Sequence, residues 1–422
     1  MSQIIQNNVS ERTSLKILFK NTNFTKIWSA QFVSNFGSYI SSFSFPLLAF
    51  LISGEEFWLG IIAIASMIPS IGISPLAGVV ADRFSRKKIM IVSNLASAFT
   101  IFLIPIGMYY YVKANITDFM IFLTIIMFLS SILQRFFSPA ESASIPLIVQ
   151  EKYIGPAVSL SQSTQHLIRV IGPIIGIAIA TTLGYSFVFI LDALTFLVSG
   201  IIIGTIKTNL DLEKSKDSNK KINFILGSKT LFNIPTIRFV GTIFFFVMFG
   251  VSLSNNFLVA MAKEELFMSD GEYGLAFSLT GLTGVISGLL LSTRISKVTK
   301  PLNLVTIGLF INGLIWILFS TIKENIFFTL ILMMGGVVSI LLRVPGTTVF
   351  MRDTPNQVIG QVFSSLDMLE SIASLIGMVL GTILVTIIGI RELFLLNGSL
   401  QFTASIFSIF YLIYSKNKLK IF

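Results

Sequence analysis

Acidic side chains inside long apolar stretches are the first residues of this sequence that could do chemistry. Asp367 and Glu370 lie three residues apart in an otherwise uncharged stretch, and Arg343 lies at a similar depth in the preceding one. Ionisable groups in an apolar medium are costly unless they are paired or hydrated. Because two acids face one guanidinium, one carboxylate is left under-compensated, and we interpret Asp367 or Glu370 as a proton-coupling group. The alternative is a gate made of salt bridges, and the two roles are compatible.

A polar stripe follows one predicted helix further upstream. Its members occur at positions i, i+3, i+4 and i+7, which places them on one helical face: Gln162, Gln165, His166 and Arg169. We expect this face to border a water-filled cavity. His166 is the only histidine, and histidine ordinarily titrates near neutral pH, so it is a candidate proton carrier. A histidine hydrogen-bonded to a neighbouring helix is the alternative.

Asp192 lies in the next apolar stretch, where it could meet Arg169. Such a pair would keep Asp192 ionised and would make both residues structural. If the pair opens during function, Asp192 becomes a proton site. The sequence leaves both interpretations open.

A short basic loop between two apolar stretches carries the densest charge cluster. It follows the pattern G-x-x-x-D-R-x-x-R-K, with Gly78, Asp82, Arg83, Arg86 and Lys87. Short cytoplasmic loops of membrane proteins collect Lys and Arg. That rule accounts for the bases, but not for Gly78 and Asp82 at this spacing.

The composition is that of a membrane protein. Of the 422 residues 54% are hydrophobic and 12% are charged, whereas soluble domains carry about 25% charged residues. The net charge of +10 does not indicate nucleic acid binding, because the bases lie between apolar segments, where they set topology. Cysteine is absent, so disulfides and thiolate metal sites are excluded. The sequence has no nucleotide-binding loop, and we expect no cofactor, no metal and no enzymatic activity.

Twelve apolar segments, six on each side of a polar stretch, predict an all-α membrane protein with twelve transmembrane helices in two six-helix halves. The segments are 27–54, 57–81, 89–112, 119–137, 156–182, 186–206, 237–261, 272–293, 302–321, 326–350, 360–388 and 393–414. The predicted parts are a cytoplasmic N-terminal segment (1–26), a first half (27–207), a cytoplasmic linker (208–235), a second half (236–414) and a cytoplasmic tail (415–422). This topology places 23 of the 30 Lys and Arg residues inside and 4 in outer loops, as the positive-inside rule requires.

An internal repeat relates the two halves. A shift of 205 residues superposes three glycines of one half on three of the other: Gly172 on Gly377, Gly176 on Gly381, and Gly184 on Gly389. The same shift places Gln162 and Gln165 on Asp367 and Glu370. The halves are therefore predicted to be pseudo-symmetric.

Three motifs together resemble a known family. The loop from Gly78 to Lys87 resembles the signature loop of the major facilitator superfamily, although Ser85 stands where the family usually has Gly. The segment Gly172-Pro173-x-x-Gly176 resembles the antiporter motif of its drug:proton exchangers. The N-terminal pattern Asn23-Phe24…Trp28…Gln31 is similar to the macrolide-efflux-type branch, which includes siderophore exporters and lysophospholipid transporters.

The resemblance implies a major facilitator fold with alternating access, in which the loop residues Gly78, Asp82, Arg83, Arg86 and Lys87 form a conformational latch. It implies a monomeric secondary transporter in the cell membrane that exports an amphipathic, drug-like or macrolide-like molecule in exchange for protons. Export of this kind is typical of multidrug and antibiotic resistance. The first apolar segment, however, lacks the acid that some exchangers carry there.

Other functions remain open at this stage. A lysophospholipid flippase or an uptake symporter would use the same fold, and a membrane sensor or immunity protein could keep the fold without transporting. Arg135 and Glu141, near the end of the fourth apolar segment, are interpreted as side chains that reach the lipid headgroups.

Overall fold

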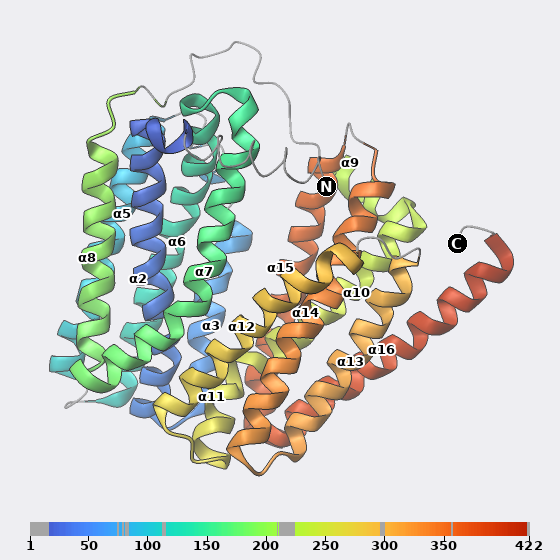
Figure 1. The fold of residues 1–422 in the computed structure, drawn as a ribbon. Helices are drawn as coiled ribbons and strands as arrows, with labels where there is room; N and C mark the ends of the chain where they lie inside the picture. Colours follow the sequence, from blue (N-terminus) through green and yellow to red (C-terminus); the bar gives the residue numbers. More distant parts are fainter. Residues whose placement is uncertain are drawn as a thin grey trace. The chain divides into compact units, whose positions relative to one another are not determined.

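The computed structural model describes residues 17–73, 76–77, 80, 84–111, 115–208, 210, 224–295, 300–355 and 358–419. All regular secondary structure within these residues is helical (Figure 1). The elements are α2 (Thr22–Ser53), α3 (Glu56–Gly72), α5 (Arg86–Tyr111), α6 (Ile116–Ile148), α7 (Glu151–Leu183), α8 (Tyr185–Gly204), α9 (Phe224–Asn233), α10 (Pro235–Ser254), η1 (Asn255–Phe257), α11 (Leu258–Ala260), η2 (Met261–Glu265), α12 (Asp270–Ile295), α13 (Pro301–Thr321), α14 (Asn325–Asp353), α15 (Ile359–Ile388) and α16 (Ile390–Leu419).

A helix lies at each of the twelve positions predicted from the apolar segments. Nine of the helices in the described ranges are long and apolar enough to cross a bilayer, and α3 and the Leu167–Leu183 part of α7 are shorter apolar helices. The chain is therefore a multi-pass membrane protein, as its composition predicts.

Asparagine caps decide where two of the helices begin. The side-chain oxygen of Asn21 accepts hydrogen bonds from the backbone N–H groups of Asn23 and Phe24, at 3.1 and 3.2 Å. Asn115 caps α6 in the same way through Thr117 N at 3.0 Å. Asn is among the best N-cap residues because its oxygen satisfies an otherwise unpaired donor. Helix α2 consequently starts at Thr22, inside the predicted cytoplasmic N-terminal segment (1–26).

The chain divides into two compact units. One comprises Met1–Ser53 and Ala65–Lys216, and the other Gly54–Ile64 and Asp217–Phe422. In the first unit α2 packs on α7 and α8, while α5 packs on α6 and α8. In the second unit α10 packs on α15 and α16, while α13 packs on α14 and α16. Counted from the start of each half, these are the same four pairs, so each unit repeats the packing of the other.

The repeated glycines hold the same places in both units. A methyl group at Gly176 of α7 would lie 2.7 Å from the carbonyl oxygen of Ile40 in α2. A methyl group at Gly381 of α15 would lie 2.2 Å from the carbonyl oxygen of Leu253 in α10. Small residues at such crossings let helix backbones approach closely.

The third pair of glycines fixes a bend. Gly184 joins α7 to α8 with φ 89° and ψ 158°, and Gly389 joins α15 to α16 with φ 88° and ψ 171°. This backbone region is essentially restricted to glycine. The spacing of 205 residues therefore reflects a shared backbone conformation as well as shared packing.

The described part of the segment predicted as a linker contains a helix. Within residues 208–235, α9 forms over Phe224–Asn233 and packs against α15. Leu231 of α9 is buried, at 2% exposed. This helix was not predicted from the sequence, because charged residues around it outweigh the short apolar face that packs on α15.

Candidate functional site

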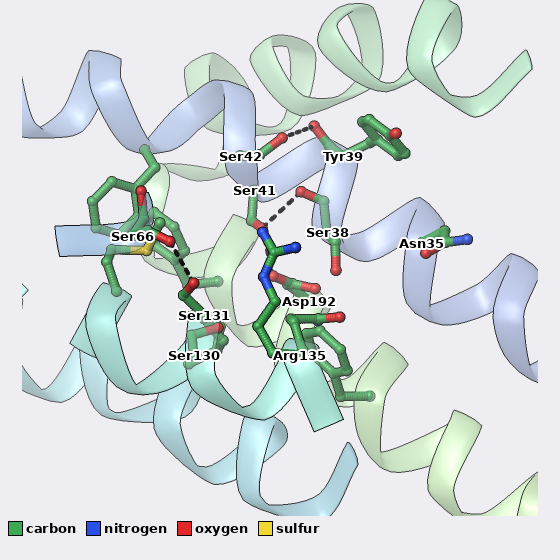
Figure 2. A pocket seen from close by; sticks show the side chains of 16 residues that line it. Asn35, Ser38, Tyr39, Ser41, Ser42, Ser66, Ser130, Ser131, Arg135 and Asp192 are labelled. Carbon is green, nitrogen blue, oxygen red and sulfur yellow. Dashed lines mark hydrogen bonds between the residues drawn. The ribbon is translucent and has the colours of Figure 1, made fainter. Parts of the chain in front are cut away.

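A polar cavity of about 380 Å³ lies within the first unit. Helices α2, α6 and α8 supply most of its wall, and Figure 2 shows their side chains extending into it. The lining combines hydroxyls, amides, one guanidinium and one carboxylate with a few apolar groups: Asn35, Ser38, Tyr39, Ser41, Ser42, Phe45, Ser66, Ile101, Met127, Ser130, Ser131, Gln134, Arg135, Phe189, Asp192 and Phe196.

Asp192 of α8 is the buried acid of this cavity, at 1% exposed. The hydroxyl of Ser41 in α2 donates to its carboxylate. Thr195 Oγ1 donates to the backbone carbonyl of Asp192 at 2.7 Å and lies 3.5 Å from its Oδ1. Gly37 leaves the room for this contact, since a methyl group there would lie 2.7 Å from Asp192 Oδ1.

Of the two interpretations left open for Asp192, the ion pair with Arg169 is not formed among the described residues. Arg169 Nη2 donates instead to the hydroxyl of Tyr39 at 3.2 Å, and its guanidinium lies 5.7 Å from the centre of that ring. Helix α2 packs against both α7 and α8. It supplies Tyr39 as the partner of Arg169 and Ser41 as the partner of Asp192.

Arg135 lines this cavity, a position that was not predicted for it from the sequence. Its side chain extends from α6 into the cavity (Figure 2), and it has neither a hydrogen bond nor an ion pair with any described residue. The interpretation of Arg135 as a headgroup contact is therefore wrong. Glu141, interpreted in the same way, is instead buried at 8% exposed, and its Oε1 has no hydrogen-bond partner within the described ranges.

The buried acid has a neutral counterpart in the second unit. The shift of 205 residues places Asp192 on Asn397 of α16. Asn397 Nδ2 donates to Ser254 Oγ at 3.0 Å and to Gly250 O at 2.9 Å. Ser254 follows Gly250 by four residues on α10, just as Ser41 follows Gly37 on α2. The position thus forms the same helix contact in both units, with an acid in one and an amide in the other.

We expect Asp192→Asn to fold as stably as the natural chain, within about 1 kcal/mol, because an amide already serves at position 397. Thermal stability is measured as the fraction of monodisperse protein left by size-exclusion chromatography after heating. Asp192→Leu, which removes the acceptor of Ser41, should lower the midpoint. If both variants lose stability equally, the charge of Asp192 itself is structural.

A second cavity, of about 230 Å³, lies within the second unit among α10, α12, α13 and α14. It is mainly apolar and aromatic: Phe244, Val247, Met248, Val251, Asn255, Leu258, Phe277, Thr280, Asn312, Ile315, Trp316, Phe319, Ile331, Leu332, Gly335, Ser339, Leu342 and Arg343. A concave, largely apolar site with a few polar groups is the common form of a small-molecule site.

Arg343 at the wall of this cavity binds one of the two predicted acids. Its Nη1 and Nη2 donate to the two oxygens of Glu370, at 3.0 and 2.9 Å. Its guanidinium also lies 5.1 Å from the centre of the Phe244 ring. The carboxylate of Asp367, one turn earlier on α15, accepts no hydrogen bond and forms no ion pair among the described residues, although it interacts electrostatically with Arg343. The under-compensated carboxylate that the sequence predicts is thus Asp367.

The remaining predicted residues are placed only in part. Gln165 is half-buried on α7, whereas the side chains of Gln162 and His166 lie outside the described residues. Gly78, Asp82 and Arg83 of the basic loop also lie outside them. Arg86 is buried and donates to Ala143 O at 2.8 Å. Lys87 donates to Ile206 O at 2.6 Å. These two residues tie the start of α5 to its own unit.

A sequence model of the Major Facilitator Superfamily matches residues 27–377 and, separately, 240–421. The chain belongs to the major facilitator superfamily. It is therefore a membrane transporter by family, and the predicted family resemblance is confirmed. Transporters of this family bind small-molecule substrates.

Relatives agree with this superfamily assignment. Macrolide efflux protein A of Streptococcus pyogenes is 24% identical over 388 residues, which cover 89% of this chain and 93% of that protein. A Na(+), Li(+), K(+)/H(+) antiporter of Planococcus maritimus is 28% identical over 163 residues, 38% of this chain and 36% of that protein. The crystal structure of a bacterial homologue of the iron transporter ferroportin in the inward-facing state matches with a TM-score of 0.72 at 16% identity, over 93% of this chain and 97% of that one. At such identity the structural likeness shows the fold alone, which confirms the predicted major facilitator fold.

Proposed function

We propose that this protein is a secondary active transporter that exports an amphipathic small molecule across the cell membrane in exchange for protons. The observation that carries the proposal is the arrangement on α15. Arg343 and Glu370 neutralise each other at the cavity wall, while the carboxylate of Asp367 has no hydrogen bond or ion pair with any described residue. A carboxylate of this kind can take up and release a proton without breaking an ion pair.

Protonation drives transport if the two conformations of the transporter differ in their affinity for the proton. A proton on Asp367 removes the one uncompensated charge beside the Arg343–Glu370 pair. The two halves then exchange access to the two sides of the membrane, with Asp82 and Arg86 of the basic loop as the latch. Asp192 and His166 are secondary candidates for the proton site.

Direction and substrate class follow from similarity. Macrolide efflux protein A, by its name, exports macrolides, and the Planococcus relative is by name a cation/proton antiporter. The motif Gly172-Pro173-x-x-Gly176 agrees with export. The protein would act as a monomer in the cell membrane, with both termini in the cytoplasm and with lipid as its surroundings.

The test uses inside-out vesicles that contain the full chain and a pH-sensitive dye. The vesicle lumen is acidified, and macrolides, cationic dyes and lysophospholipids are then added in turn. Proton release from the lumen on addition of a macrolide or dye is the expected result. Vesicles without the protein are the control.

Other outcomes would replace the proposal. Movement of a compound without a proton signal would indicate a facilitator. Movement of lysophospholipids alone would indicate a flippase, and accumulation in right-side-out vesicles would indicate an uptake symporter. If no compound moves and simultaneous loss of Asp367, Glu370 and Asp82 has no effect in cells, the protein is a sensor or immunity protein.

A further inference from the structure

Asn312 of α13 brings an amide into the apolar cavity of the second unit. Its Nδ2 donates to Gln401 Oε1 of α16 at 2.5 Å. Its Oδ1 accepts no hydrogen bond from any described residue. Asn312 therefore keeps its acceptor, Oδ1, unused at the cavity, whereas one of the two hydrogens on Nδ2 is already given to Gln401.

A chain of buried amides fixes that orientation. The backbone carbonyl of Gly250 can only accept, so the group of Asn397 that faces it at 2.9 Å must be Nδ2. Asn397 Oδ1 then accepts from Gln401 Nε2 at 2.8 Å, which leaves Gln401 Oε1 to accept from Asn312. Amide orientations are assigned from such networks. Here a backbone carbonyl at one end sets the polarity of all three amides.

The hydrogen-bonded amides of Asn397, Gln401 and Asn312 are held rigidly, because the helices approach closely around them. Asn397 and Gln401 are 0% and 1% exposed. A methyl group at Gly250 would lie 2.2 Å from Gln401 Nε2. Where α13 crosses α16, a methyl group at Gly398 would lie 2.7 Å from Gly313 O. This crossing brings Asn312, next to Gly313, within reach of Gln401.

The two hydroxyls of the cavity are not free donors, because each already donates to a backbone carbonyl. Thr280 Oγ1 donates to Ala276 O at 2.8 Å, and Ser339 Oγ donates to Gly336 O at 2.7 Å. Arg343 gives two of its five N–H groups to Glu370. Asn255 is exposed and bonded to no described side chain, so its amide is free to present either edge.

We propose that this cavity selects ligands that carry an N–H or O–H donor, with Asn312 Oδ1 as the acceptor that determines the specificity. Gln401 and Asn397 are positioning residues that hold this acceptor. The inference deepens the proposed function by assigning a hydroxyl or a protonated amine to the substrate. It rests on that function only in taking the cavity as part of the substrate site.

The test measures binding and does not depend on transport. Trp316 lines the cavity, and the chain has three tryptophans. Trp28→Phe and Trp58→Phe therefore make Trp316 the single tryptophan. A bromoaryl probe in the cavity quenches its fluorescence. The probes are two matched pairs: protonated 4-bromobenzyl(dimethyl)amine with its N-methyl quaternary analogue, and 4-bromobenzyl alcohol with its methyl ether. Each pair differs in one donor hydrogen.

In the purified full chain, the donor probe of at least one pair is expected to bind about 5- to 100-fold more tightly than its methylated partner. Asn312→Leu and Asn312→Ser should reduce this ratio to near one. Gln401→Met should reduce it too and should tighten binding of the methyl ether, because a released Asn312 amide can turn its Nδ2 to the ligand. Asn255→Leu is the matched control, in which both partners weaken and the ratio stays.

Each ratio compares two probes on one variant, so partial loss of folded protein cancels. Preference in the amine pair alone, the alcohol pair alone or both supports the proposal and identifies the donor as ammonium, hydroxyl or either. Equal affinities within both pairs in the parent chain would overturn it, as would a ratio that persists in both Asn312 variants. Either result leaves proton-coupled export untouched, since that is decided by the proton signal in vesicles.

Discussion

Asp367→Asn is expected to abolish substrate-driven proton release, down to the level of vesicles without protein. The physical reason is that the carboxylate of Asp367 has no hydrogen bond or ion pair in the described structure, whereas Glu370 shares two hydrogen bonds with Arg343. The amide introduced by Asp367→Asn cannot take up and release a proton as the carboxylate does. Exchange of labelled for unlabelled substrate across the membrane should persist, because this exchange needs no net proton movement.

Glu370→Gln is expected to impair proton release indirectly. It frees the guanidinium of Arg343, which already interacts electrostatically with Asp367 and would then hold that carboxylate in its charged form. The double variant Arg343→Met with Glu370→Met removes both charges together. Arg343 is partly exposed, whereas Glu370 is buried. Removing both charges together leaves no unpaired charge beside Asp367, so the double variant should recover proton release.

The control is Glu392→Gln, which alters an exposed acid in the first turn of α16 and should leave proton release unchanged. Persistent release in Asp367→Asn would contradict the assignment of the proton to Asp367. Recovery in the double variant but not in Glu370→Gln would show that Glu370 controls Arg343 and does not itself carry the proton.

Gly381→Ala is expected to be strongly destabilising, because Gly381 lies at one of the closest backbone crossings in the described structure. Its methyl group would lie 2.2 Å from the carbonyl oxygen of Leu253, so α15 would have to move away from α10. Overpacking of this kind costs about 1–3 kcal/mol. The midpoint of thermal denaturation, followed by size-exclusion chromatography in a mild detergent, should fall clearly.

A graded series sharpens this expectation. Gly176→Ala, at 2.7 Å from Ile40 O, should lose less stability than Gly381→Ala. Gly204→Ala is the control, because a methyl group there meets no atom within 4 Å. Equal midpoints for Gly381→Ala and Gly204→Ala would show that the α10–α15 crossing yields without cost. The repeated glycines would then have a role other than keeping the helices close together.

The two units show how duplicated elements can take different tasks. The contact between Gly37, Ser41 and Asp192 has its counterpart in Gly250, Ser254 and Asn397. In the second unit the amide continues through Gln401 to a cavity, and in the first unit the acid itself lines one. The same helix crossing thus supports a chain of amides in one unit and an acid in the other.

The sequence alone determined the membrane class and the family, and it predicted the positions of twelve helices. These properties depend on quantities summed along the chain: apolar length, charge density and motif spacing. It also predicted the acids Asp367 and Glu370 with Arg343, because charges in apolar segments stand out one by one. The repeat of 205 residues likewise predicted that Gly176 and Gly381 have equivalent places.

Only the tertiary structure decided which groups are partners. The sequence proposed Arg169 for Asp192, but Ser41 and Thr195 are its partners, because the rotation of each helix about its axis is set by packing against its neighbours. The structure also showed that Glu370, and not Asp367, is bound to Arg343. Asn397 and Gln401 are spaced i and i+4 in an apolar segment. This spacing could have predicted a polar face, but only charged residues were considered in that segment. Their link to Asn312 requires a helix that lies far away in the sequence, and side-chain contact across such distances is a property of the fold.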